Sequence, residues 1–159
     1  TEKLIVHSPV RGVHPNLYEG LMTFVKFIGS DTLVGANMVK EHLQHLGMTT
    51  HICKSSRTTE LGKLLSTTYY GILIAWHGEM NRICKENKVS FDDAANLFND
   101  TYNKGYSSLG RPDVIRPTLY PPGASIGGHC ILPNVKILKK YSESIAYELI
   151  EKYKKGEIK

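Results

Sequence analysis

The chain has 159 residues, of which 41% are hydrophobic and 22% are charged, and its formal net charge is +5. This length and composition are those of an ordinary folded protein and exclude a mainly disordered chain. The longest apolar run, Ile72–Trp76, is far shorter than the roughly 20 residues that a membrane-spanning helix needs, so we expect no membrane partner.

The positive charge does not indicate a nucleic-acid-binding protein. Seven of the 20 Lys and Arg residues are lysines at or after Lys136, where they alternate with glutamates as on a solvated helix face. We therefore expect no nucleic-acid partner. Three widely spaced cysteines form no CxxC pair, and the start of the chain resembles no secretion signal. These features favour free thiols and a cytoplasmic location.

The first third of the chain predicts alternating strands and helices. Three short apolar runs predict strands, at residues 4–6, 24–29 and 49–54. Residues 10–20 are loop-like, and residues 31–46 predict a helix with Ser30 or Asp31 as its N-cap and Gly47 as its stop. The succession of strand, helix and strand is typical of a crossover unit with parallel pairing.

We expect two domains and a mixed α/β fold that is mainly α-helical. Residues 1–58 would form a partial Rossmann-like segment with a small parallel sheet, and residues 59–159 a helical domain. Within the latter, apolar residues recur every three or four positions from 59 to 87, which predicts one long helix. This helix is apolar on nearly all sides, so its own domain or a partner chain must enclose it. In so small a chain we favour a homodimer interface.

A polar line follows the same predicted helix and includes Lys63, Thr67 and His77. Buried polar groups destabilise a fold unless they are paired, so this line indicates either an interhelical hydrogen-bond network or an edge that faces a ligand. Beyond it, Ser90 predicts the N-cap of a short helix that ends near Tyr102.

The last part of the chain combines a long loop with a final helix. Residues 104–134 hold five Gly and five Pro, and connections of that length are usually functional or disordered. Residues 135–155 then predict one amphipathic helix that Gly156 stops.

The end of the loop holds the densest group of candidate functional residues, in the segment Pro122–Cys130. The adjacent Gly127 and Gly128 allow a ligand to approach the backbone closely. A cysteine near a helix N-terminus, such as Cys130, is a workable nucleophile because the helix dipole stabilises its thiolate. The alternative is that Cys130 is an inert, small hydrophobic residue.

A resemblance to a known family rests on these residues. The sequence Gly-Gly-His-Cys at residues 127–130, preceded by a long helix that contains Glu-Leu-Gly-Lys-Leu-Leu at residues 60–65, resembles the central region of the UDP-glucose/GDP-mannose dehydrogenase family. Segments 8–11 and 27–29 lie in the order of the end of the family's first nucleotide-binding domain. The resemblance implies that residues 59–159 adopt a fold like the C-terminal domain of 6-phosphogluconate dehydrogenase.

The resemblance also implies an activity. In the family, NAD oxidises a nucleotide-sugar alcohol twice, through a cysteine thiohemiacetal and a thioester that water releases as the acid. Cys130 matches the nucleophile, and Lys63 matches the helix lysine that stabilises a developing oxyanion. Substrate contacts fall on five positions: Gly127, Gly128, Arg11, Thr67 and Asn134. Arg11 is included among these positions because the guanidinium of a loop arginine can bind a phosphate through two hydrogen bonds.

Three positions depart from the family pattern. Val10 stands where the family usually has a carboxylate, Thr67 where it has an asparagine, and Asn134 where it has an aspartate. Neither Asn134 nor Val10 can accept a proton as a carboxylate does. The chain also lacks the G-x-G-x-x-G fingerprint of a dinucleotide site, and we assign no metal site. Two hypotheses therefore stay open: a modified enzyme, or a non-catalytic dimerisation or sugar-nucleotide-binding module.

Overall fold

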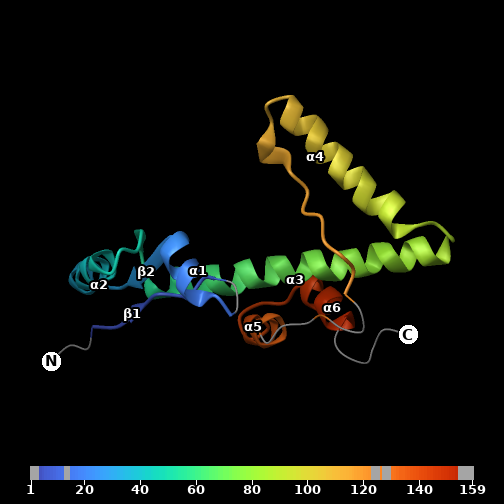
Figure 1. Cartoon of the computed structure of the whole chain (residues 1–159). Helices are drawn as coiled ribbons and strands as arrows, with labels where there is room; N and C mark the ends of the chain where they lie inside the picture. Colours follow the sequence, from blue (N-terminus) through green and yellow to red (C-terminus); the bar gives the residue numbers. More distant parts are fainter. Residues whose placement is uncertain (1–3, 13–14, 123–125, 127–129, 154–159) are drawn as a thin grey trace. The chain divides into compact units, whose positions relative to one another are not determined.

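The chain forms two compact units, Thr1–Leu65 and Ser66–Lys159, in a computed structural model (Figure 1). The model describes residues 4–12, 15–122, 126 and 130–153. The helix α3 (Ser56–Glu86) continues from the first unit into the second. The boundary predicted at residues 58 and 59 lies within this helix and stays a prediction.

The first unit is a three-stranded sheet with helices. Its elements are β1 (Val6–His7), α1 (Leu17–Thr23), β2 (Lys26–Ser30), α2 (Leu33–His45) and β3 (Thr50–Cys53). The strand order is β1-β2-β3, and β2 and β3 are parallel with Ile28 opposite Ile52, as predicted. β1 departs from the parallel arrangement, because it runs antiparallel to β2 and pairs Val6 with Ser30.

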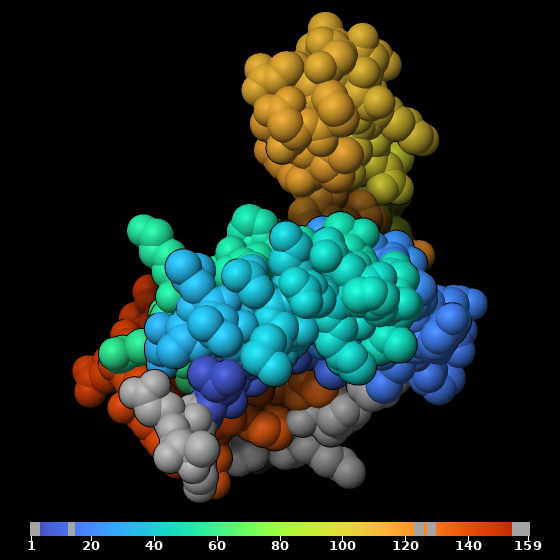
Figure 2. All heavy atoms as spheres, turned by 90° about the vertical axis from the view of Figure 1, so that its left-hand side faces the viewer, coloured from blue at the N-terminus to red at the C-terminus, as the bar shows by residue number. Residues whose placement is uncertain are grey.

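The helix α2 packs its small residues onto the sheet. Gly35 and Ala36 are buried, and Ile28 of β2 is fully buried. Figure 2 shows the other face of α2, in cyan, at the surface of the first unit, where Val34 and Met38 are exposed. The predicted N-cap was wrong, because the Thr32 hydroxyl accepts the N–H of Gly35 at 3.2 Å. The predicted stop is confirmed: Gly47 has a φ of +83°, which favours glycine.

The helix α1 was missed by the sequence analysis, which predicted a loop there. The helix follows Pro15, whose carbonyl accepts the N–H of Leu17 at 2.9 Å. Its buried Gly20 lies against the segment that follows β1: a Cβ on Gly20 would lie 2.5 Å from Cα of Gly12. A side chain larger than hydrogen does not fit, so α1 packs directly on the backbone of that segment.

Among its described residues, the second unit contains the rest of α3 and five further helical elements. These are the π-helical turn η1 (Asp92–Leu97), α4 (Phe98–Ser108), the 3₁₀ turn η2 (Pro112–Val114), α5 (Ile131–Leu138) and finally α6 (Ile145–Lys152). The predicted cap is confirmed, because Ser90 Oγ accepts the N–H of Asp93 at 3.3 Å. The helix continues six residues beyond the predicted end at Tyr102.

The predicted single helix over residues 135–155 was wrong. Its residues are divided between α5 and α6, and α5 begins earlier because Pro133 fits within the first turn of a helix. Ser144 starts α6 afresh, since its hydroxyl accepts the N–H of Ala146 at 3.2 Å. The core of the unit comes from both helices, with Val135, Leu138 and Ile150 almost completely buried.

Two glycines let α3 approach these helices closely. A Cβ on Gly71 would lie 2.7 Å from the Cγ2 of Ile131, and a Cβ on Gly78 would lie 2.4 Å from ring carbon Cε1 of Tyr153. The face of α3 that carries Gly71 and Gly78 is therefore covered by α5 and the end of α6.

The segment 115–122 is fastened at two points in the second unit. Arg116 exchanges two hydrogen bonds of 2.8 Å with the side-chain amide of Asn103 on α4. The buried His77 on α3 donates from Nδ1 to the carbonyl of Leu73, so its Nε2 is free of a proton and accepts the N–H of Leu119 at 3.4 Å. The polar line on α3 thus serves partly as a hydrogen-bond network.

Candidate functional site

The loop after β1 holds Lys63 in the first unit. Lys63 lies near the start of α3 and donates from Nζ to the carbonyl oxygen of Val10 at 3.0 Å. At position 10 the family resemblance implies a carboxylate side chain, whereas here Lys63 binds the backbone oxygen of Val10. The structure thus brings Lys63 to the loop that also carries Arg11.

Arg11 packs against aromatic rings. Its guanidinium carbon lies 5.1 Å from the ring centroid of Phe24 and 5.5 Å from that of Phe27. Both distances are within the range of a cation–π contact. The half-buried arginine is therefore held against these rings, and its proposed phosphate contact stays a prediction.

A second lysine, which the sequence analysis missed, holds the same loop. Lys26 of β2 is 8% exposed, and its Nζ donates to the carbonyls of Ser8 at 3.1 Å and Pro9 at 3.0 Å. Burial lowers the pKa of Lys26 below its usual value, and repulsion from Lys63 lowers it further. The signal was present in the sequence as one charged residue inside an otherwise apolar strand.

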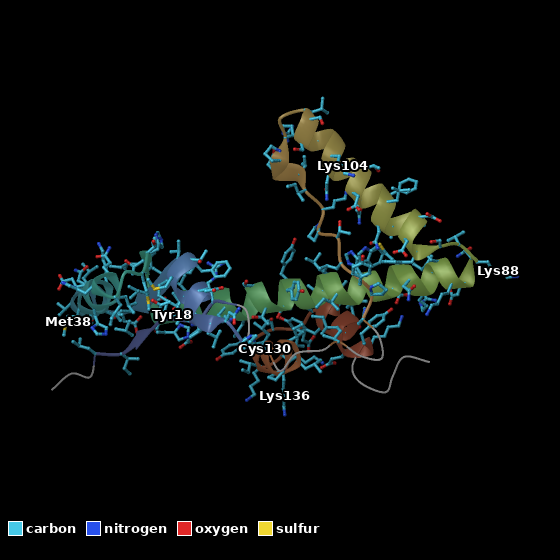
Figure 3. All side chains as sticks on the ribbon, viewed as in Figure 1. Tyr18, Met38, Lys88, Lys104, Cys130 and Lys136 are labelled. Atoms are coloured by element: carbon cyan, nitrogen blue, oxygen red, sulfur yellow. The ribbon has the colours of Figure 1, made fainter. Side chains whose placement is uncertain are left out.

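Cys130 lies at the start of α5 in the second unit (Figure 3). It is the N-cap residue, half-buried, with its thiol free of any disulfide. Asn134 is one turn further on, and its N–H donates to the Cys130 carbonyl at 3.1 Å. Residues four apart lie on the same face of a helix, so the structure brings Cys130 and Asn134 together.

Thr67, Gly127 and Gly128 are the remaining predicted site residues. Thr67 is half-buried on α3, one turn after Lys63 and therefore on the same face of that helix. Gly127 and Gly128 lie outside the described residues. The roles predicted for all of these residues remain predictions.

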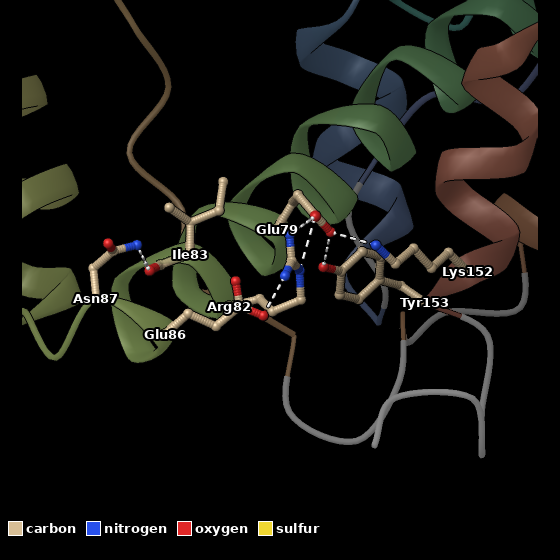
Figure 4. A network of polar contacts seen from close by, with 7 residues as sticks. All are labelled: Glu79, Arg82, Ile83, Glu86, Asn87, Lys152 and Tyr153. Carbon is tan, nitrogen blue, oxygen red and sulfur yellow. Dashed lines mark hydrogen bonds and ion pairs between the residues drawn. The ribbon is translucent and has the colours of Figure 1, made fainter.

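A network of charged groups in the second unit was also missed (Figure 4). The Glu79 carboxylate accepts hydrogen bonds from Arg82 Nε at 2.9 Å, Lys152 Nζ at 2.8 Å and the Tyr153 hydroxyl at 2.7 Å. These bonds, that from Arg82 foremost, lower the pKa of Glu79 to about 2. Burial and the hydrogen bond to Glu79 raise the pKa of Tyr153. The network joins α3 to the end of α6.

The start of α2 lacks the G-x-G-x-x-G turn of a dinucleotide site. Dinucleotide folds leave a helix N-terminus open after a glycine-rich turn. Here the N-terminus of α2 is capped by Thr32, whose own N–H donates to Ser30 Oγ at 3.3 Å. Within the described residues, no cluster of three or more His, Cys, Asp or Glu side chains is placed to hold a metal ion.

Comparison with known proteins places this fold and loop in one class. The family model described as the UDP-glucose/GDP-mannose dehydrogenase family, central domain, matches residues 57–155. The chain therefore belongs to this family, and the predicted resemblance is confirmed. The mainly helical fold with a small three-stranded sheet is confirmed as well.

The similar proteins are UDP-sugar dehydrogenases. The UDP-N-acetyl-D-mannosamine dehydrogenase of Methanococcus vannielii is 29% identical over 127 aligned positions, which cover 80% of this chain and 27% of that protein. The protein of the same name from Methanocaldococcus jannaschii is 24% identical over 164 aligned positions, gaps included, which cover 95% of this chain and 35% of that one.

Two solved structures share the fold. The UDP-D-ManNAc dehydrogenase of Pyrococcus horikoshii has a TM-score of 0.73 at 19% identity, over 94% of this chain and 34% of that one. The UDP-N-acetyl-mannosamine dehydrogenase of S. aureus has a TM-score of 0.61 at 23% identity, over 94% and 33%. The chain thus spans about a quarter to a third of the length of the relatives it matches.

Proposed function

We propose that this chain is the substrate-binding and dimerisation region of a nucleotide-sugar dehydrogenase, with Cys130 as its nucleophile. The observation that carries the proposal is the position of Cys130 at the N-cap of α5, inside the match to the family's central domain. A helix N-terminus favours a thiolate, which is the nucleophilic form of cysteine. The names of the relatives favour a UDP-sugar as the substrate over a GDP-sugar.

In this proposal the chain's own residues carry two bond-forming steps. The Cys130 sulfur adds to the carbonyl carbon of a sugar aldehyde and forms a thiohemiacetal, whose oxygen takes up a proton. After the thiohemiacetal loses a hydride to the acceptor and becomes a thioester, water attacks the thioester carbon, the C–S bond breaks, the acid leaves and the Cys130 thiol is regenerated. Lys63 would stabilise the negative oxygen in these steps. The hydride acceptor, NAD by family resemblance, would be held by residues other than those described.

The homodimer is part of the same proposal. Tyr69, Trp76 and Ile83 follow one another at seven-residue spacing on α3, so they lie on one face of the helix. Their exposures are 61%, 47% and 41%. Leu65, one turn before Tyr69, is also exposed. A row of large apolar side chains of this kind is typical of a helix that pairs with a second helix.

The three free cysteines, Cys53, Cys84 and Cys130, support a reducing compartment, so we propose a cytoplasmic location. In the part of the chain that the structure describes, no helix combines the length and apolarity needed to cross a bilayer.

A chimera tests the enzyme proposal. In it, this chain replaces the matching third of the Methanocaldococcus jannaschii dehydrogenase, and oxidation of UDP-N-acetyl-D-mannosamine is followed by NADH formation. We expect activity that Cys130→Ala abolishes, whereas the matched control Cys53→Ala, on β3, leaves it unchanged. An inactive chimera, or one that tolerates Cys130→Ala, would overturn the assignment.

The second candidate function is a non-catalytic module that binds a sugar nucleotide or dimerises. The observations that favour it are Asn134 beside Cys130, where the family has a carboxylate, and the backbone partner of Lys63. Restoring the family residues with Val10→Glu, Thr67→Asn and Asn134→Asp in the chimera separates the two. Activity that appears only after restoration supports the module, and activity already present in the unaltered chimera contradicts it.

A further inference from the structure

We propose that Lys26 is a positioning residue for Lys63, which it acts on through the backbone of Ser8, Pro9 and Val10. This inference rests on the proposed role of Lys63. Its basis is that three consecutive backbone carbonyls accept hydrogen bonds from the ammonium groups of two lysines. Lys26 takes the first two carbonyls, and Lys63 takes the third, at distances of 3.0–3.1 Å.

The geometry makes the loop the connection between the two lysines. Val10 follows Pro9 directly, and the proline ring restricts the backbone on both sides of it. Fixing the carbonyls of Ser8 and Pro9 therefore restricts where the Val10 carbonyl points. That carbonyl accepts a hydrogen bond from Lys63, so the position of Lys26 contributes to the position of the catalytic candidate.

The burial of Lys26 argues against a role in stability alone. Its side chain brings a positive charge into a site with 8% exposure, and in the described residues no carboxylate forms an ion pair with it. A buried ammonium without a counter-charge is costly, and a neutral donor would satisfy the same carbonyls at lower cost. The like charge of Lys63 also contributes to lowering the pKa of Lys26, after burial.

Amine labelling of the chain tests the inference without any activity. Lysines are methylated at pH 8 in 1 M NaCl, and the rate at Lys63 is followed by mass spectrometry in the wild type, Lys26→Met and Lys26→Arg. We expect labelling about two- to tenfold faster in Lys26→Met, the range that corresponds to one net hydrogen bond. Lys26→Arg, which keeps the charge and the donors, should restore the slow rate.

The sign of the change separates positioning from a simple charge effect. Removing a neighbouring positive charge by itself lets an amine keep its proton more firmly and slows its labelling. High salt weakens that opposing effect. Labelling of Lys104 on α4 in the same samples should not change. A rate at Lys63 that is unchanged or slower in Lys26→Met would overturn the proposal.

A second measurement covers the case that Lys26→Met does not fold. The reciprocal variant Lys63→Met changes a half-buried residue near the start of α3 and leaves Lys26 in place. The pKa of Lys26, read from its ¹³Cε signal during a pH titration, should rise when the like charge of Lys63 is removed. An unchanged pKa of Lys26 would show that Lys63 does not lie close enough to act on it and would overturn the proposal.

The chimera provides the functional readout. Lys26→Met should lower kcat while KM for the UDP-sugar changes by less than about twofold, because the substrate contacts themselves are intact. Lys26→Arg should rescue kcat. If the unaltered chimera is inactive, the proposed function fails, while the labelling and titration results still decide whether Lys26 positions Lys63.

Discussion

Lys26 in the first unit and Glu79 in the second are both charged and poorly exposed, but they are held in opposite ways. Glu79, whose side chain is 14% exposed, is surrounded by Arg82, Lys152 and the Tyr153 hydroxyl. Among the described residues, Lys26 donates only to backbone carbonyls, and the like charge of Lys63 lowers its pKa further. The first arrangement stabilises the charged form, and the second disfavours it. A buried charge with counter-charges joins elements, whereas one without them indicates a role other than stability.

The largest effect should come from filling the space beneath the Glu79 network. Gly78→Ala places a methyl group against the Tyr153 ring, 2.4 Å from its nearest carbon. Overpacking of this kind typically costs about 1–3 kcal/mol. We expect a loss near the upper end, because the clash is with a ring that Glu79 holds in place. Urea unfolding followed through the fluorescence of Trp76, the single tryptophan, measures it.

Gly62→Ala is the matched control on the same helix. A Cβ at Gly62 meets nothing within 4 Å. Alanine has the higher helix propensity, so this substitution should stabilise the chain by up to about 1 kcal/mol. A Gly78→Ala variant as stable as Gly62→Ala would contradict the packing described for Tyr153.

Removing the charge of Glu79 should have the next largest effect. Glu79→Gln weakens the bonds from Arg82 and Lys152, and we expect a loss of about 1–2 kcal/mol, moderated because both cations are half-exposed. Glu86→Gln removes the other carboxylate that binds Arg82, but Glu86 is 60% exposed, so its loss should be near zero. Equal losses in the two variants would contradict a special role for Glu79.

The same carboxylate predicts a pH dependence. The pKa of Glu79 is about 2 in the folded chain and near its usual value of 4.5 in the unfolded chain. The stabilisation is therefore complete above about pH 4.5 and is lost as the pH falls toward about 2. Thermal unfolding between pH 2 and 6 should show a slope that becomes shallower in Glu79→Gln. An unchanged slope would assign the acid sensitivity to other carboxylates.

Lys26 should give the smallest change in stability, which sharpens the comparison. Lys26→Met loses two hydrogen bonds but removes the cost of burying an ammonium, so the free energy of unfolding should stay within about 1 kcal/mol of the wild type. A loss above about 2 kcal/mol in urea unfolding, followed by circular dichroism, would mean that Lys26 is mainly a structural anchor.

The sequence predicted the elements whose signals are local. The apolar spacing of α3, the crossover of β2, α2 and β3, and the Ser90 cap all depend on neighbouring residues, and all three are confirmed. α1 was missed because its burial rests on a contact between Gly12 and Gly20 that no periodicity reveals. The break between α5 and α6 was missed because the amphipathic pattern continues through it.

The candidate site divides along the same line. Cys130 was a candidate from its residue type and its place before a predicted helix, whereas Lys63 and Asn134 were predicted from the family resemblance, and the roles of all three stay predictions. Lys26 was not found, because its hydrogen bonds depend on a strand placing its side chain beside loop residues 17 and 18 positions earlier. Glu79 and Tyr153 lie 74 positions apart, so only the packing of α6 on α3 brings them together.

The two fastenings of segment 115–122 have a consequence for hydrogen exchange. The backbone N–H groups of Arg116 and Leu119 have acceptors on Asn103 and His77, while that of Thr118 between them has none in the described part of the chain. An extended segment should therefore contain two slowly exchanging amides separated by a fast one. The Leu119 N–H lies 3.4 Å from its acceptor on His77, whereas the Arg116 N–H lies 2.8 Å from its acceptor on Asn103, so the Leu119 amide should exchange faster than the Arg116 amide. The two amides would then report separately how firmly the segment is held to α3 and to α4.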